Sequence, residues 1–159
     1  MSIYNKVMLL YGGISAEREI SIITSKEISR ALVRLGYEVI EIDAELDLSD
    51  HISEHKPDVI FNGLHGTWGE DGEVQKILEL NNVPYTHSGI ESSQLAMDKH
   101  KSAELFIKNN FNYPTTNLVS INSINNYAFP EYPYVIKPRN EGSSVGVGIS
   151  GIKKKKKGI

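Results

Sequence analysis

Three short strand-like runs, the first apolar and the second alternating, are separated by helix-like segments and constrain the fold of this chain more than any other feature. The runs cover residues 7–11, 37–43 and 57–62. Apolar runs of this length that alternate with helical patterns are typical of parallel strands joined by crossover helices. We therefore expect an α/β fold with a parallel sheet, in which ligands collect at the carboxyl ends of the strands.

The first run leads into a glycine turn and then a predicted helix. Gly12 and Gly13 follow the strand, Ser15 is a plausible N-cap, and Gly36 ends the helix. The buried face of this helix is predicted from an apolar stripe, which consists of Ile20, Ile23, Ile28, Ala31, Leu32 and Leu35. Because the turn lacks the pattern GxGxxG, a dinucleotide-binding interpretation is weak.

The loop after the third run, residues 63–73, holds an unusual mixture of residues. It contains four glycines, three acids, His65 and the only tryptophan. An imidazole at a strand end can donate to a carboxylate or an oxyanion. The alternative is a surface histidine bonded to its own loop. Glu70 or Asp71 is expected to cap the next helix, residues 72–82. A single histidine among loop acids lacks the spacing of a metal-ligand set, so we expect no metal site in this chain.

The later half of the chain predicts shorter elements. We expect strands at residues 83–86 and 116–120, helices at 91–97 and 98–110, and a short helix within 121–131. A domain boundary is placed near residue 112.

The stretch from Tyr134 to Gly148 joins an apolar run to a loop of glycines and serines. Glycine lets the backbone approach a ligand closely, and successive N–H groups of such turns form an anion site. Lys137 at the end of the run adds a positive charge. These features predict a phosphate-holding loop, and an ordinary hairpin turn is the alternative.

Composition excludes several classes of partner and site. The net charge is −3 and there are no cysteines, so we expect neither a nucleic-acid surface nor disulfides nor thiolate metal sites. No apolar stretch reaches the length of a membrane span, and no signal core opens the chain, so a cytoplasmic protein is expected. Five successive lysines near the end predict a disordered tail.

Several motifs together resemble D-alanine–D-alanine ligases of the ATP-grasp superfamily. They are residues 10–21, 64–66, 69–72, 84–86, 88–89, 97–99, 137–138 and 141–146. The resemblance implies a Rossmann-like, pre-ATP-grasp substrate domain over residues 1–112. Part of an ATP-grasp central subdomain would follow over 113–150, and then the lysine-rich tail over 151–159.

The resemblance also implies an activity, which is ATP-dependent ligation of two D-alanines through an acyl phosphate for peptidoglycan precursors. Glu17 would hold the ammonium group of the first D-alanine, and His65 would face its carboxyl end. Ser143 would join the hydrogen-bond network around Glu17, so that both count as catalytic. Family members are commonly homodimeric.

ATP would be held by residues of two further motifs. The ATP-binding set implied by the family is Lys99, Lys137, Glu141, Gly142, Ser143, Ser144, Val145 and Gly146. The Mg²⁺ ligands, a flexible tyrosine loop and an arginine for the reacting phosphate belong to the C-terminal half of family members.

Family members are about twice as long as this chain, a length typical of two or more domains. We therefore expect a truncated ligase that is inactive alone and that arose from a frameshift at the tract encoding the lysines. The alternatives are a D-alanine-binding module, a non-catalytic remnant with exposed sheet edges, and a nucleotide-binding oxidoreductase, against which the missing GxGxxG argues.

Overall fold

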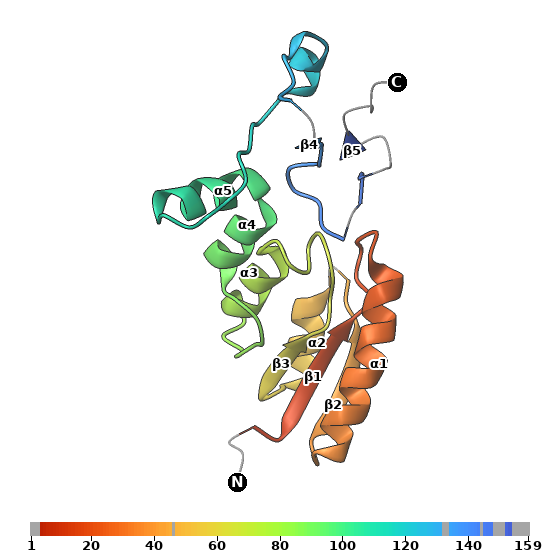
Figure 1. Ribbon diagram of the computed structural model, residues 1–159. Coiled ribbons are helices and arrows are strands. Elements are labelled where there is room, and N and C mark those ends of the chain that lie inside the picture. The colour runs from red at the N-terminus through yellow and green to blue at the C-terminus, as the bar shows by residue number, and fades with distance from the viewer. Residues whose placement is uncertain (1–3, 46, 132–133, 144, 148–151, 154–159) are drawn as a thin grey trace. The chain divides into compact units, whose positions relative to one another are not determined.

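The computed structural model describes residues 4–45, 47–131, 134–143, 145–147 and 152–153. By compactness the chain divides into two units, residues 1–94 and 95–159 (Figure 1). This division lies before residue 112, where the sequence predicts a domain boundary. The domain limits at residues 112 and 150 stay predictions.

The first unit is built on a parallel sheet of three strands, β1 (Lys6–Tyr11), β2 (Glu38–Asp43) and β3 (Val59–Asn62). The strand order is β2-β1-β3, so β1 is central. The predicted α/β fold with a parallel sheet is therefore confirmed. The strand predicted at residues 83–86 is reduced to an isolated parallel bridge between Tyr85 and Ile60 of β3.

Helices cover both faces of this sheet, namely α1 (Arg18–Arg34), α2 (Leu48–His55) and α3 (Glu73–Leu80). Met8 and Leu10 of β1 lie in one core cluster with apolar residues of α2 and α3. Leu9 points to the opposite face, because successive side chains of a strand alternate. There it lies close to Gly63 and Ser25 of α1. The sheet is thus the middle of three layers (Figure 1).

The buried face of α1 differs from the prediction. Ser21, Ser25 and Ser29 are buried, whereas Ile20 and Ile23 are more than half exposed. Leu35 is exposed as well, and Ile28, Ala31 and Leu32 are half-buried. The apolar-stripe rule fails here because the helix packs closely on the chain at Gly63, where only small side chains fit. A Cβ atom at residue 63 would come within 2.5 Å of Ser25 Oγ.

The ends of two helices also refine the sequence interpretation. The N-cap of α1 is Glu17 rather than Ser15, whose hydroxyl accepts a hydrogen bond from the Glu17 amide at 3.1 Å. Asp71 accepts from the first amide of α3, that of Glu73, at 3.1 Å, as expected for an acid at a helix start. The N-cap of α3 itself is Gly72.

Helix α4 (Ile90–Met97) spans the division between the units, and α5 (Lys99–Lys108) begins the second unit. A 3₁₀ helix (Ile121–Asn126) follows, and β4 (Tyr134–Val135) pairs antiparallel with β5 (Ile152–Lys153). The strand predicted at residues 116–120 does not form, because this segment has no pairing partner in the described part of the chain. Of the predicted tail, residues 152–153 form β5, and residues 154–159 lie outside the described residues.

None of the described helices is long and apolar enough to cross a membrane.

Candidate functional site

Two loops meet at the carboxyl ends of β1 and β3 in the first unit. The loop 12–17 follows β1, and the loop 63–72 follows β3. Ser15 Oγ donates to the His65 carbonyl at 2.6 Å, and Ser21 Oγ donates to the Gly63 carbonyl at 2.7 Å. These bonds join segments far apart in the sequence at the edge where parallel sheets collect ligands.

Glu17 lies inside this loop cluster. The residue is only 7% exposed, and its carboxylate lies beside Gly66, whose φ of +71° suits glycine. A Cβ atom at residue 66 would stand 2.9 Å from Glu17 Oε1. The glycine therefore makes room for the carboxylate. A carboxylate held in so little solvent forms a strong charge-assisted hydrogen bond with a cationic group.

His65 is oriented by groups from two elements. Its Nε2 lies 3.2 Å from Thr24 Oγ1 of α1, and its Nδ1 lies 3.7 Å from Glu70 Oε1 of its own loop. The structure thus brings His65 and Glu17 into one loop cluster. The sequence analysis missed Thr24, which a pattern search does not find because its hydroxyl only positions the ring.

Two acids of the loop 63–72, Glu70 and Asp71, hold its backbone by accepting hydrogen bonds from its amides. Glu70 Oε2 accepts from the Gly66 amide at 2.8 Å, and Asp71 Oδ2 accepts from the Trp68 amide at 2.8 Å. Both carboxylates therefore satisfy backbone N–H groups close to their own position. This arrangement supports the structural interpretation of these acids and gives neither the role of a metal ligand.

Two buried amide side chains complete the loop, and sequence analysis missed both. Asn62 Nδ2 and Gln75 Nε2 donate to the Gly69 carbonyl at 2.9 and 3.0 Å. Asn62 Oδ1 also accepts from the Leu64 amide at 3.1 Å. The two amides fix the path of the loop, because a buried carbonyl without a donor is costly. An asparagine at the last position of a buried strand is the signal that could have revealed this.

The turn after β1 is held by an ion pair. The Arg18 guanidinium donates to both oxygens of the Asp43 carboxylate at the end of β2. It also donates to the Gly13 carbonyl at 3.1 Å. The hydrogen bond from Arg18 lowers the pKa of Asp43 below its usual value. A Cβ atom at Gly12, where φ is +71°, would collide with Asp43 Oδ1 at 2.1 Å. The glycine is therefore needed for this contact.

In the second unit, Asp98 ties α5 to the predicted phosphate loop. Its carboxylate accepts from Arg139 Nε and Nη2 at 2.9 and 2.6 Å and from the His100 and Lys101 amides at 3.1 Å. The hydrogen bond from Arg139 is the largest cause that lowers the pKa of Asp98 to about 2. The sequence analysis missed Arg139 as a positioning residue.

Lys99 is brought onto the same loop segment. Its Nζ donates to the carbonyls of Arg139 and Glu141, at 3.3 Å for the former. Two predicted ATP ligands, Lys99 and Glu141, are therefore in direct contact. Lys137 is exposed at the start of the segment.

The loop itself turns tightly at the predicted residues. The Val145 amide donates to the Gly142 carbonyl at 2.8 Å. Ser143 has a φ of +43° and Gly146 a φ of +72°, and a Cβ atom at Gly146 would meet Pro138 Cγ at 2.6 Å. Ser144 lies outside the described residues. The predicted link between Ser143 and the Glu17 network joins the two units and stays a prediction.

Sequence comparison finds similarity between this chain and a known group of proteins. The family described as "D-ala D-ala ligase N-terminus" matches residues 44–88. The D-alanine–D-alanine ligase of Rickettsia typhi is 47% identical over 143 residues, which are 90% of this chain and 44% of that protein. The chain is therefore similar, over 90% of its length, to part of the D-alanine–D-alanine ligases, and the matching family model describes their N-terminus. It spans about half the length of the curated relatives that it matches.

Solved structures agree with this similarity. A Bacillus anthracis D-alanine–D-alanine ligase complexed with ATP is 28% identical, has a TM-score of 0.72, and matches 94% of this chain and 50% of its own. The ligase of Helicobacter pylori has a TM-score of 0.73 at 20% identity, covering 97% of this chain and 57% of its own, which shows a shared fold.

Proposed function

We propose that this chain carries the first D-alanine site and part of the ATP site of a D-alanine–D-alanine ligase, which acts in the cytoplasm on peptidoglycan precursors. The observation that carries the proposal is the buried Glu17 carboxylate between two loops at the carboxyl edge of the sheet. The relatives are named D-alanine–D-alanine ligases, and the reaction is taken from those names.

In this reaction the carboxylate of one D-alanine attacks the γ-phosphate of ATP, forming an acyl phosphate and releasing ADP. The amine of a second D-alanine then attacks the acyl carbon, loses a proton, and expels inorganic phosphate. Catalysis of phosphoryl transfer rests mainly on positioning and on neutralising charge. The residues of this chain would supply both of these for the first substrate.

Glu17 would bind the ammonium group of the first D-alanine. The α-ammonium and α-carboxylate of an amino acid are separated by one carbon, so an anchored ammonium fixes where the carboxylate lies. His65, oriented by Thr24 and Glu70, would donate to that carboxylate. The electrostatic pair thereby holds the nucleophilic oxygen toward the phosphate.

Lys99 and Lys137 would contact the phosphates of ATP, and the loop 142–146 would cover them. The donor set fits an anion, because it combines two ammonium groups with a tight glycine-serine turn. Mg²⁺, when bound, would neutralise phosphate charge. Its ligands are expected in the C-terminal half, since the Asp98 carboxylate of this chain is already held by Arg139.

The test is Glu17→Gln in a fusion of residues 1–147 with the remaining C-terminal part of the Rickettsia typhi ligase. Glutamine keeps the shape and removes the charge. Because a hydrogen bond to a charged group contributes about 1.5–3 kcal/mol, kcat/KM for D-alanine should fall roughly 10- to 100-fold, whereas the KM for ATP should change little. Thr67→Ser, a conservative change on the other loop of the cluster (residues 63–72), is the matched control. Equal losses for D-alanine and ATP would refute the ammonium role.

A D-alanine-binding module without catalysis is the second candidate. The observation that favours it is that the Glu17 and His65 loop cluster lies wholly within the first unit. Such a module binds D-alanine but releases no ADP when ATP and Mg²⁺ are added. ADP release by this chain alone would exclude it.

A further inference from the structure

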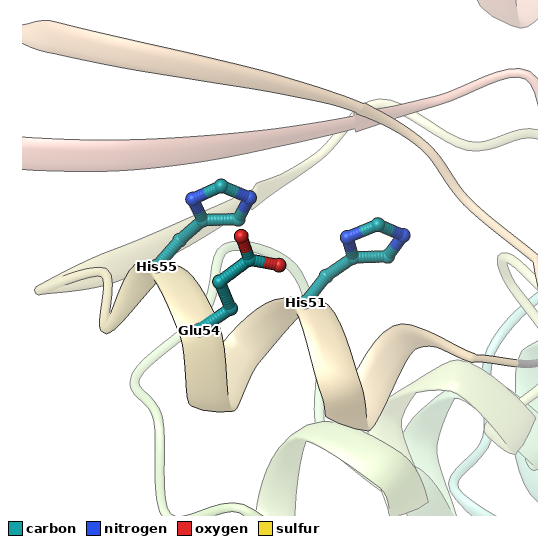
Figure 2. Close-up of side chains that lie close together, drawn as sticks. All are labelled: His51, Glu54 and His55. Carbon is teal, nitrogen blue, oxygen red and sulfur yellow. The ribbon is translucent and has the colours of Figure 1, made fainter.

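Helix α2 carries two histidines and a glutamate that converge. His51, Glu54 and His55 each offer a ligand atom, and these atoms all lie within 4.8 Å of one another. Figure 2 shows the Glu54 carboxylate between the two imidazole rings. The rings are stacked, with centroids 6.2 Å apart and an angle of 7° between their planes. The convergence follows from the sequence, because residues three and four apart share one helix face.

We propose that this helix face binds a divalent transition-metal ion of the Zn²⁺ class. Two imidazole nitrogens and one carboxylate oxygen are ligands that Zn²⁺ accepts, and they leave a coordination position for water. Magnesium prefers oxygen ligands, so the site differs in kind from the magnesium site expected for the ligase reaction. The absence of a metal site was expected from the loop at residues 63–73, and the spacing His-x-x-Glu-His on α2 was not recognised from the sequence.

The Glu54 carboxylate is not already committed to another group. In the described part of the chain, no hydrogen bond or ion pair involves the Glu54 carboxylate. Glu54 is exposed, and the two histidines are half-buried. A small shift of these side chains closes the set around an ion, since long side chains on a helix surface change rotamer readily.

The surrounding charges favour a cation on one side and oppose it on the other. Asp47 Oδ2 lies 3.5 Å from His51 Nε2, and a carboxylate on one ring nitrogen orients an imidazole for metal binding through the other. Lys6 Nζ donates to the His55 carbonyl at 2.7 Å and lies 3.8 Å from a Glu38 carboxylate oxygen. Its charge is therefore partly balanced by groups other than Glu54.

The same order of residues occurs in a class of zinc peptidases. In this chain the motif lies on an eight-residue surface helix, and we propose metal binding without catalysis.

The test is titration of the full chain with Zn²⁺ against a chromophoric chelator. We expect one Zn²⁺ per chain at this site, and at least about tenfold weaker binding in His51→Ala and in His55→Ala, since even outer-shell changes commonly cost 10–100-fold in affinity. His87→Asn is the matched control. It removes a histidine of the same unit, and asparagine tolerates the positive φ of that position, so Zn²⁺ affinity should be unchanged.

A second measurement on the unaltered chain covers the case in which a variant fails to fold. Zn²⁺, but not Mg²⁺, should shift the imidazole NMR signals of His51 and His55 and leave those of His87 and His100 in place. Unchanged signals of His51 and His55, or Zn²⁺ affinity that survives the double substitution at 51 and 55, would overturn the proposal.

Discussion

Single residues fix the loops of the two candidate sites in place, and Asp98 is the clearest example. It is 8% exposed, carries a negative charge, and is satisfied by the Arg139 guanidinium and two amides of α5. Removing one partner of such a group leaves a charge without compensation, which is costly. The contact of α5 with the predicted phosphate loop therefore depends on the protonation state of one carboxyl group.

The pKa of Asp98, lowered from 3.8 to about 2, predicts an acid-sensitive contact. A carboxyl whose folded pKa lies below its unfolded value stabilises the fold fully above the unfolded value. This stabilisation is lost as pH falls from about 4 through about 2. It amounts to roughly 1–2 kcal/mol, since one pKa unit is about 1.4 kcal/mol and the partly exposed Arg139 is screened by solvent.

The amide NMR shifts of His100 and Lys101, which donate to Asp98, measure this titration directly. The midpoint should lie near pH 2 and should move toward 3.8 in Arg139→Gln. A midpoint near 4 in the unaltered chain would show that the ion pair contributes little.

At the scale of elements, the three strands of the parallel sheet were predicted correctly from the sequence, whereas the packing of α1 was not. Strand-like runs predicted β1, β2 and β3, and the segments that follow β1 and β3 hold Glu17 and His65. The serine face of α1 could not be predicted, because what selects serine is close approach to Gly63, a contact between segments far apart in the sequence. The partners Thr24 and Arg139 were missed for the same reason.

Two serines on this face give a matched pair. Ser21 Oγ bonds the Gly63 carbonyl, whereas Ser25 Oγ is buried without a hydrogen-bond partner among the described residues. Ser21→Ala should reduce the free energy of unfolding by about 1–2 kcal/mol, since it leaves a buried carbonyl unpaired. Ser25→Ala should cost nothing or stabilise slightly, because it removes an unsatisfied hydroxyl.

Urea unfolding followed by fluorescence of Trp68, the only tryptophan and part of the first unit, checks this pair. An equal reduction in the free energy of unfolding in both variants would mean that packing alone holds α1, with no contribution from the Ser21 hydrogen bond.

At the scale of the whole molecule, one unit holds the loop cluster of Glu17 and His65, and the other unit holds the predicted phosphate loop. Each site is internally satisfied: Glu17 and His65 lie in one loop cluster of the first unit, and Lys99 contacts Glu141 in the second. The family resemblance assigns the first pair to the D-alanine site and the second pair to the ATP site, and both assignments stay predictions. How these groups would act together belongs to the proposed function, because the chain spans about half the length of the curated relatives that it matches.

The central claim is that the chain supplies a working D-alanine half-site, and the fusion of residues 1–147 with the C-terminal part of the Rickettsia typhi ligase tests it most directly. We measure ADP release with ATP and Mg²⁺, with D-alanine or L-alanine added, and compare it with the C-terminal part alone. We expect ADP release that depends on D-alanine and on the presence of residues 1–147. A folded fusion that binds ATP but shows no response to D-alanine, while the intact Rickettsia typhi enzyme does, would contradict it.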